Sequence, residues 1–265
     1  MVKIPRTIKI NGVVYCREAL QERIDFVLSQ PEAEEWEKNI YRFLKEWTDD
    51  SPYVYARTSG STGKPKTIRL EKSKMLASAE LTNRYFKLTE NSKALLCLSA
   101  GYIAGKMMLV RAMQAGFDIY VVKPASTPMF RTPVIFDFAA VVPMQMQSIL
   151  DQPNGRGWLD CHIKSLIIGG GAVAPALEQR LRSLLVQCYA TYGMTETVSH
   201  VALRSINGQK TSQWYEAMPG IRFSVDERDC LIIHAPHLHD TPLVTNDVVT
   251  LDSETRFAWL GRFDH

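Results

Sequence analysis

Hydrophobic and polar positions along the first two thirds of the chain follow the periods of strands and helices in turn. Short apolar runs, such as residues 93–100 (KALLCLSA) and 163–168 (IKSLII), are typical of buried strands. Between them lie stretches with amphipathic helical spacing, such as residues 73–88 and 104–116. Strands that alternate with helices predict an α/β fold in which layered, mainly parallel sheets are flanked by helices.

The N-terminal segment fits the same pattern. A strand is predicted at residues 7–12, then one amphipathic helix over residues 16–30 and a second from Pro31 to residue 47. The second begins with proline and has glutamates in its first turn, where the helix dipole favours negative charge.

The pattern of hydrophobic and polar positions changes near residue 200. Beyond it, short β-rich runs are separated by turn residues, with little helical spacing. This pattern predicts a smaller β-rich, barrel-like subdomain. We therefore expect an α/β nucleotide- and acyl-binding core over residues 1–200 and a β-rich subdomain over residues 201–265.

Composition narrows the class of protein. Hydrophobic residues make up 46% and charged residues 22%, which is an ordinary globular mixture with enough apolar surface for a core. The net charge of +3, with both signs mixed along the chain, argues against nucleic-acid binding. The five cysteines are scattered without a CxxC pair, and no apolar run approaches the ~18–20 residues of a membrane span. We expect a cytoplasmic protein without membrane insertion.

The segment TSGSTGKPK, residues 58–66, lies between two β-rich runs and concentrates hydroxyls, glycines and lysines. A Walker A loop needs Ser or Thr after its lysine, and Pro65 stands after Lys64, so P-loop chemistry is disfavoured. Glycines let backbone amides turn inward as an anion nest, to which hydroxyls and a lysine add donors and charge. We predict a phosphate-binding loop in preference to a solvated turn. Its phosphate ligands would be Thr58, Ser59, Gly60, Ser61, Thr62, Gly63 and Lys66.

A second segment, YGMTET at residues 192–197, carries complementary chemistry. Tyr192 offers a flat face for adenine, and Thr195 a hydroxyl for the α-phosphate. Glu196 offers a carboxylate oxygen for Mg²⁺, which takes few protein ligands beside phosphate oxygens. The alternative for this segment is a turn with an exposed glutamate.

These two segments resemble the signatures of the adenylate-forming superfamily, which contains acyl-CoA synthetases, adenylation domains and luciferases. Three further landmarks follow the family's order. GGGAV at residues 169–173 resembles its adenine-side turn, Asp247 its ribose-binding aspartate (with Asn246 where glycine is usual), and GRFDH its ribose-contacting Arg262 and hinge residue Asp264. The resemblance runs from residue 58 to residue 264.

The resemblance implies ATP, Mg²⁺ and coenzyme A as co-substrates and cofactors of an AMP-forming acid–thiol ligase. It implies catalytic roles for Lys66, Thr195 and Glu196, with Glu196 as the Mg²⁺ ligand. The remaining ATP- or AMP-binding residues would be Gly170, Gly171, Ala172, Tyr192, Gly193, Met194, Asp247 and Arg262.

The sequence ends one residue past the hinge position. The family's C-terminal lid, with the lysine that assists adenylation, would follow there and is absent from this sequence. We expect a truncated chain rather than a natural lid-less core, and impaired activity for this chain alone.

The acyl side is predicted on the segment LSAGYIAGKMMLVRAMQAG, which corresponds to a family segment that lines the acyl pocket. Arg111 lies there on an otherwise apolar helix. Its guanidinium could bind a second carboxylate of the substrate, or its stem could pack while its head reaches solvent. The arginine and the stretch YGMTETVSH resemble o-succinylbenzoate–CoA ligases of menaquinone biosynthesis, which favours the first reading. The expected acyl-site residues are Tyr102, Gly105, Lys106, Arg111, Thr197, Ser199 and His200.

Alternative functions remain open. The chain could serve another aryl or short-chain carboxylic acid, either as a ligase or as an adenylation domain, or it could be a nucleotide-binding module without turnover. The HAPHLH stretch at residues 234–239 is interpreted as a surface turn rather than a zinc site. The expected partners are the small-molecule acid, ATP and coenzyme A, and a homodimer is compatible with the sequence.

Overall fold

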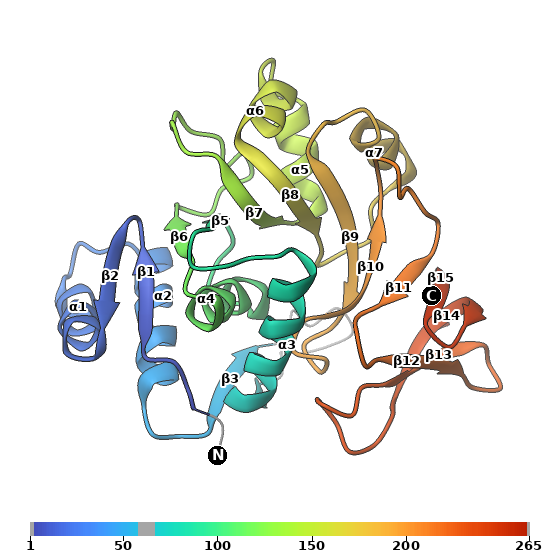
Figure 1. Ribbon diagram of the computed structural model, residues 1–265, viewed down its shortest axis with the longest axis horizontal. Coiled ribbons are helices and arrows are strands. Elements are labelled where there is room, and N and C mark those ends of the chain that lie inside the picture. The colour runs from blue at the N-terminus through green and yellow to red at the C-terminus, as the bar shows by residue number, and fades with distance from the viewer. Residues whose placement is uncertain (1–2, 58–66, 264–265) are drawn as a thin grey trace.

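The computed structural model describes residues 3–57 and 67–263. A mixed sheet dominates it, in the strand order β12-β13-β14-β15-β11-β10-β9-β8-β7-β5-β6-β1-β2 (Figure 1). The strands of this sheet are β1 (Thr7–Ile10), β2 (Val13–Cys16), β5 (Lys93–Leu96), β6 (Asp118–Val121), β7 (Phe136–Val141), β8 (Ile163–Ile168), β9 (Gln187–Gly193), β10 (His200–Ser205), β11 (Tyr215–Ala217), β12 (Arg222–Val225), β13 (Cys230–His234), β14 (Leu243–Ser253) and β15 (Arg256–Arg262). The helices are α1 (Arg17–Ser29), α2 (Glu35–Thr48), α3 (Lys72–Tyr85), α4 (Ile103–Ala115), α5 (Pro143–Leu150), α6 (Gly155–His162) and α7 (Pro175–Leu181). The predicted α/β class is confirmed.

The sheet has a parallel half that carries the layered core. Strands β1, β6, β5, β7, β8 and β9 pair in parallel in that spatial order. Because the carboxyl ends of parallel strands lie at one edge, the segments after β5, β7, β8 and β9 meet there. All the described landmarks of the α/β part lie on these segments or on α4, which follows β5.

Side chains on successive positions of these strands enter two separate cores. On β5, Ala94 and Leu96 pack into the cluster that includes α3 and α4, whereas Leu95 packs into the cluster that includes α5, α6 and α7. A period of two along a strand produces this division, because neighbouring side chains point to opposite faces. The parallel half of the sheet is therefore covered by helices on both faces, as Figure 1 shows.

The second half of the sheet is antiparallel. It begins where β9 pairs with β10 and continues through β11, β15, β14 and β13 to β12 at the edge. The predicted strand-rich texture after residue 200 is confirmed, and its strands extend the same hydrogen-bonded sheet. The division into residues 1–200 and 201–265 stays a prediction.

Helix α4 shows how local sequence fixes an element of the acyl side. Its predicted end is confirmed at Gly116, which takes the left-handed conformation (φ 79°) and donates its N–H to Ala112 O. Near the other end, a Cβ at Gly105 would lie 2.3 Å from Ser99 O, so only glycine lets the helix pass the preceding loop so closely. Residues Gly105–Met113 are all buried.

Some predicted boundaries were wrong. The second helix begins at Glu35 rather than at Pro31, because residues 31–33 form turns and a bend before it. The structure also adds α6 and β2, which the periodicity did not predict.

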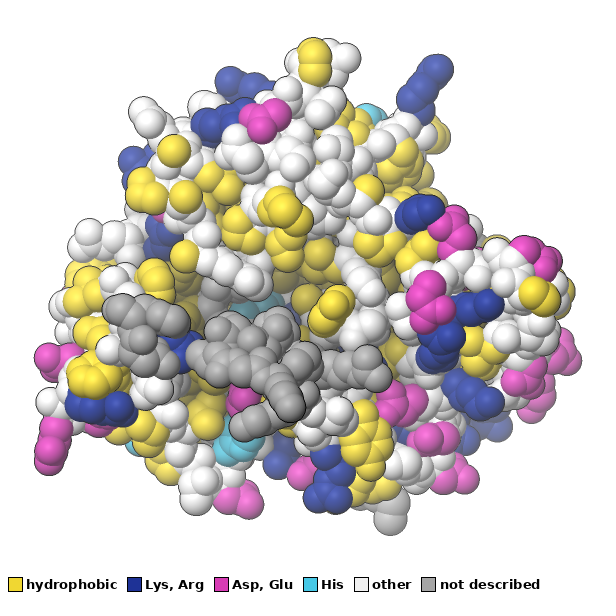
Figure 2. Space-filling model, turned by 180° about the vertical axis from the view of Figure 1, so that it is seen from behind, with side chains coloured by type: hydrophobic (Ala, Val, Ile, Leu, Met, Phe, Trp, Pro, Cys, Tyr) yellow, Lys and Arg dark blue, Asp and Glu magenta, His cyan; other side chains and the backbone are white. Residues whose placement is uncertain are grey.

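A small hairpin stands apart from the main sheet. Strands β3 (Tyr53–Arg57) and β4 (Thr67–Glu71) pair antiparallel, with Arg57 opposite Thr67. These are the two strands predicted on either side of the phosphate-like segment. Seen from behind, acidic and basic side chains are interspersed over the surface (Figure 2). None of the described helices is long and apolar enough to cross a membrane.

Candidate functional site

The carboxyl end of β9 carries the YGMTET segment into a tight turn. A Cβ at Gly193 would lie 2.5 Å from Ser199 O and 2.6 Å from the Cα of His200, so glycine is required where the chain folds back. The Thr197 hydroxyl holds the turn: it accepts from the Met194 N–H at 2.9 Å and lies 2.8 Å from Ser199 O. Thr197 is fully buried, so it acts first on the shape of this turn.

Tyr192 and Asp247 come together from distant strands. The Tyr192 hydroxyl donates to Asp247 Oδ2 at 2.7 Å, and Trp259 Nε1 donates to Oδ1 at 3.2 Å. Asp247 on β14 stands opposite Arg262 on β15 in the ladder. Burial, and then the nearby Asp247 carboxylate, raise the pKa of Tyr192, so the phenol stays protonated as the donor. Three of the predicted nucleotide residues, Tyr192, Asp247 and Arg262, are thus neighbours.

The glycine turn after β8 lies beside β9, the strand that carries Tyr192. Gly170 has φ of 79°, and a Cβ at Gly169 would lie 2.3 Å from Thr191 Oγ1 on β9. Gly170, Gly171 and Ala172 are exposed, so their backbone is open to a ligand.

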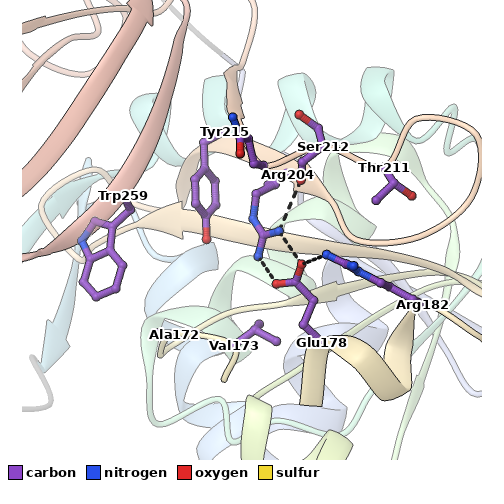
Figure 3. A pocket seen from close by; sticks show the side chains of 10 residues that line it. Ala172, Val173, Glu178, Arg182, Arg204, Thr211, Ser212, Tyr215 and Trp259 are labelled. Carbon is purple, nitrogen blue, oxygen red and sulfur yellow. Dashed lines mark hydrogen bonds and ion pairs between the residues drawn. The ribbon is translucent and has the colours of Figure 1, made fainter. Parts of the chain in front are cut away.

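A pocket of about 440 Å³ adjoins the turn (Figure 3). Glu178 of α7 lines this pocket. Its carboxylate accepts hydrogen bonds from Arg204 at 2.7 and 3.0 Å and from Arg182 at 3.1 Å. Hydrogen bonds from Arg204 lower the pKa of Glu178. The pocket is lined by Ala172, Val173, Glu178, Arg182, Arg204, Thr211, Ser212, Gln213, Tyr215 and Trp259. Ala172 follows the glycine turn and Trp259 donates to Asp247, so the pocket adjoins two parts of the predicted nucleotide site.

Glu196 lies partly buried on the turn after β9, next to Thr195. In the part of the chain that the structure describes, no lysine or arginine forms an ion pair with its carboxylate. Its backbone carbonyl accepts from His239 Nε2 at 2.6 Å. A carboxylate that pairs with no described lysine or arginine, on a turn held by His239, suits the predicted Mg²⁺ ligand.

The predicted acyl site centres on Arg111. Its side chain is 2% exposed, so the alternative in which its head reaches solvent is wrong. One guanidinium nitrogen donates to Ser199 Oγ at 2.6 Å and the other contacts Met108 Sδ at 3.6 Å. Within residues 3–57 and 67–263, Nε has no partner and no carboxylate pairs with the group. Burial lowers the pKa of Arg111 to about 9.

The other predicted acyl residues divide. Ser199 and His200 lie beside Arg111, with the His200 ring buried. Lys106 instead reaches the hairpin: its Nζ donates to Tyr55 O at 2.9 Å and lies 3.7 Å from Glu46 Oε2. Tyr102, which precedes α4, is 57% exposed. The residues Thr58, Ser59, Gly60, Ser61, Thr62, Gly63, Lys66 and Asp264 lie outside the described part of the chain.

The three histidines of residues 234–239 do not converge. His234 Nε2 lies 2.8 Å from the Ser224 hydroxyl, whereas His239 reaches Glu196. Among the described residues, no group of three or more His, Cys, Asp or Glu side chains is arranged to hold a metal ion.

Comparison with known proteins gives the family. The family described as AMP-binding enzyme matches residues 7–243, which is most of the chain. The chain belongs to the AMP-binding enzyme family. A solved acyl-CoA synthetase (AMP-forming)/AMP-acid ligase II-like protein from Dyadobacter fermentans DSM 18053 is 38% identical, with a TM-score of 0.80 over 89% of this chain and 67% of that chain.

More distant relatives carry a more specific name. The 2-succinylbenzoate–CoA ligase of Geobacillus sp. (strain WCH70) is 25% identical over 203 residues, covering 74% of this chain but 41% of the relative. The o-succinylbenzoate coenzyme A synthetase MenE of Bacillus subtilis, solved in complex with ATP and magnesium ion, has a TM-score of 0.63 at 16% identity over 92% of this chain and 62% of that chain. At that identity the likeness concerns the fold. The chain spans about two fifths of the curated relative's length.

Three residues of this AMP-binding enzyme were missed in the sequence. Trp259 donates to Asp247, His239 donates to the Glu196 carbonyl, and Thr82 of α3 lies 3.2 Å from His200 Nε2. Trp259 stands three positions before Arg262 on the same strand, a signal that could have been noticed. His239 and Thr82 act through tertiary contacts, which cannot be predicted from the spacing of residues in the sequence.

Proposed function

We propose that this chain is the core of an ATP-dependent acid–CoA ligase, with o-succinylbenzoate as its acid. The observation that carries the proposal is Arg111, a buried guanidinium without a described carboxylate partner. A buried charge is strongly destabilising unless it is paired, so such a group is expected to have a ligand with opposite charge. o-Succinylbenzoate has two carboxylates, so one can pair with Arg111 while the other reacts.

The reaction would proceed in two steps. One carboxylate of the acid attacks the α-phosphorus of ATP and displaces pyrophosphate, which gives the acyl-adenylate. The coenzyme A thiol then attacks the acyl carbon, its proton is lost, and AMP leaves. Placing the reactants and neutralising charge at the phosphates would supply most of the rate enhancement.

Each described residue has a task in this scheme. Asp247, which Tyr192 and Trp259 hold in place, would accept hydrogen bonds from the ribose hydroxyls. Thr195 would donate to the α-phosphate. Glu196 would hold Mg²⁺, which when bound lowers the charge repulsion at the phosphates. Arg111 would bind one carboxylate of the acid, so that the other carboxylate faces the nucleotide.

The test is calorimetric titration of o-succinylbenzoate into this chain in the presence of MgATP, with benzoate and a medium-chain fatty acid as comparison ligands. We expect selective binding of o-succinylbenzoate and a loss of at least tenfold in its affinity for Arg111→Met, equivalent to about 1.4 kcal/mol. Equal binding of all three acids would remove the assignment of the acid and leave the nucleotide chemistry standing.

The metal assignment needs a separate measurement. Glu196→Gln keeps the shape of the side chain and removes its charge, so nucleotide affinity should lose its dependence on Mg²⁺. Arg111→Met is the matched variant here, because it should leave that dependence intact. Unchanged Mg²⁺ dependence in Glu196→Gln would contradict the role of Glu196.

A further inference from the structure

A chain of hydrogen bonds runs from Arg111 through Ser199 and His200 to α3. Arg111 donates to Ser199 Oγ at 2.6 Å, and Ser199 Oγ lies 3.4 Å from His200 Nδ1. His200 Nε2 lies 3.2 Å from Thr82 Oγ1, and the Thr82 hydroxyl lies 3.3 Å from the Ser78 carbonyl on the same helix. The chain joins α4, the turn before β10, β10 itself and α3.

If all four contacts are hydrogen bonds at the same time, the two ends of this chain give each proton one direction. A guanidinium only donates and a carbonyl only accepts. Thr82 therefore donates to Ser78 O and accepts from His200 Nε2–H. The imidazole is then unprotonated at Nδ1, which accepts the Ser199 hydroxyl proton. The lone pairs of Ser199 Oγ are left for Arg111.

We propose that His200 is a positioning residue: as the neutral Nε2–H tautomer it draws the Ser199 hydroxyl proton away from Arg111 and so holds the guanidinium in one orientation. The role of this orientation in acid binding rests on the proposed function. The hydrogen-bond chain itself does not, because every member is a described residue of this protein.

The electrical surroundings favour the neutral imidazole. Burial, and then the positive charge of Arg111, lower the pKa of His200 well below its ordinary value. The groups facing the ring from α3 and from the preceding turn, Thr82 and Ser199, are neutral hydroxyls. An imidazolium would donate from Nδ1 as well as from Nε2, which would reverse the Ser199 hydroxyl and place two cations in one buried cluster.

The first experiment reads the tautomer directly. Two-bond ¹H–¹⁵N spectra of ¹⁵N-histidine-labelled protein, assigned with His200→Asn, should show the Nε2–H pattern for His200 at pH 7, unchanged down to pH 5. Thr82→Val removes the acceptor for Nε2–H and should shift the ring toward a mixture of tautomers. An Nδ1–H pattern or an imidazolium at pH 7 in the unmodified chain would overturn the proposal.

The second experiment follows Arg111. His200→Leu removes the Nδ1 acceptor, whereas His200→Asn presents a carbonyl oxygen near its position. With MgATP present, o-succinylbenzoate affinity should fall roughly tenfold in His200→Leu, the loss expected for one hydrogen bond to a charged group, and by less than about twofold in His200→Asn. Benzoate affinity should not change in either. His237→Asn, a half-buried histidine elsewhere, is the matched control.

These outcomes separate the two proposals. If the unmodified chain binds no acid selectively, the proposed function fails, and the tautomer together with the Arg111 Nε–H signal in His200→Leu still decides the positioning role. If the unmodified chain binds o-succinylbenzoate and His200→Leu binds it equally well, the positioning role fails and the proposed function stands.

Discussion

Arg111 is a residue whose place in the core has an energetic consequence. Its guanidinium is buried with a serine hydroxyl and a thioether as described partners. A hydroxyl satisfies one donor but does not neutralise charge, so the folded state carries an uncompensated desolvation penalty. Residues kept for binding often reduce stability in this way.

We therefore predict that Arg111→Met stabilises the protein while it removes selective acid binding. The free energy of unfolding should rise by about 1–4 kcal/mol, the range seen when buried charges are replaced by apolar side chains. Urea denaturation measures this change. Arg131→Met, at an exposed arginine, is the control and should change stability by less than about 0.5 kcal/mol. A destabilised Arg111→Met would mean that the guanidinium contributes structurally.

His200 predicts a pH dependence of stability. Its pKa in the folded protein lies below that of the unfolded chain, so at acidic pH the unfolded chain binds a proton that the folded protein excludes. Stability contributed by the neutral ring is present above about pH 6.5 and is lost as the pH falls toward the folded-state pKa.

The expected slope from this group is roughly 1 kcal/mol per pH unit below pH 6. Urea denaturation from pH 7.5 to pH 5 measures it, and subtracting the profile of His200→Asn isolates the histidine. If the stability of the unmodified chain and that of His200→Asn changed with pH in the same way, His200 would have the same pKa in the folded and unfolded states, against this prediction.

For single residues, the sequence identified candidates such as Arg111 more successfully than it predicted the contacts that surround them. Arg111 was found because a cation interrupts an apolar helix, yet periodicity could not say whether its head was buried or exposed. Thr82 was not found, because a threonine on an amphipathic helix has no distinguishing spacing. Its contact with His200 depends on how α3 packs against the turn before β10.

At the scale of elements, glycines decide how closely α4 and its loop approach each other. Gly105 is buried in α4 against the Ser99 carbonyl, whereas a Cβ at Gly157 of α6 would meet nothing within 4 Å. Both glycines lie inside helices, and their intrinsic effect on the helix is the same. Only the surroundings differ.

Alanine at these two positions should therefore have opposite effects. Gly105→Ala forces the backbone apart and should destabilise the protein by about 1–3 kcal/mol. Gly157→Ala should stabilise it by about 0.5–1 kcal/mol through helix propensity. Chemical denaturation of both variants measures the contrast. Similar changes in the two variants would indicate that the close approach at Gly105 relaxes readily.

Hydrophobic periodicity predicted which segments form helices and which form strands, but it did not predict which strands pair in the sheet. The alternation of strands and helices predicted a parallel region, and β5 to β9 form one. Nothing in the local pattern placed β1 beside β6 or β2 at the edge of the sheet. Such long-range pairings depend on which apolar faces remain to be covered once the helices have packed.

For the whole molecule, the strand pair β9–β10 matters most, because it joins the two predicted parts. Its ladder places Tyr192 opposite Ala202 and Thr191 opposite Leu203, across position 200. One hydrophobic cluster also contains Val198 and Val201, together with residues as far apart as Ile8 and Phe257. Tyr192 and Asp247, two of the predicted nucleotide residues, would lose their contact if either part opened.

We therefore predict that the chain unfolds in a single cooperative transition. The two parts share a hydrophobic core and the β9–β10 ladder. Unfolding of the strands after residue 200 would therefore expose apolar surface of the α/β part as well. Variants that retain only Trp47, which is fully buried in α2, or only Trp259 in β15 would report on the two parts separately. Their fluorescence midpoints in urea should coincide with each other and with that of the circular dichroism signal. An earlier midpoint for the Trp259 variant would show that the β-rich part is an independent unit, and the contact between Tyr192 and Asp247 would then be a contact between two bodies free to separate.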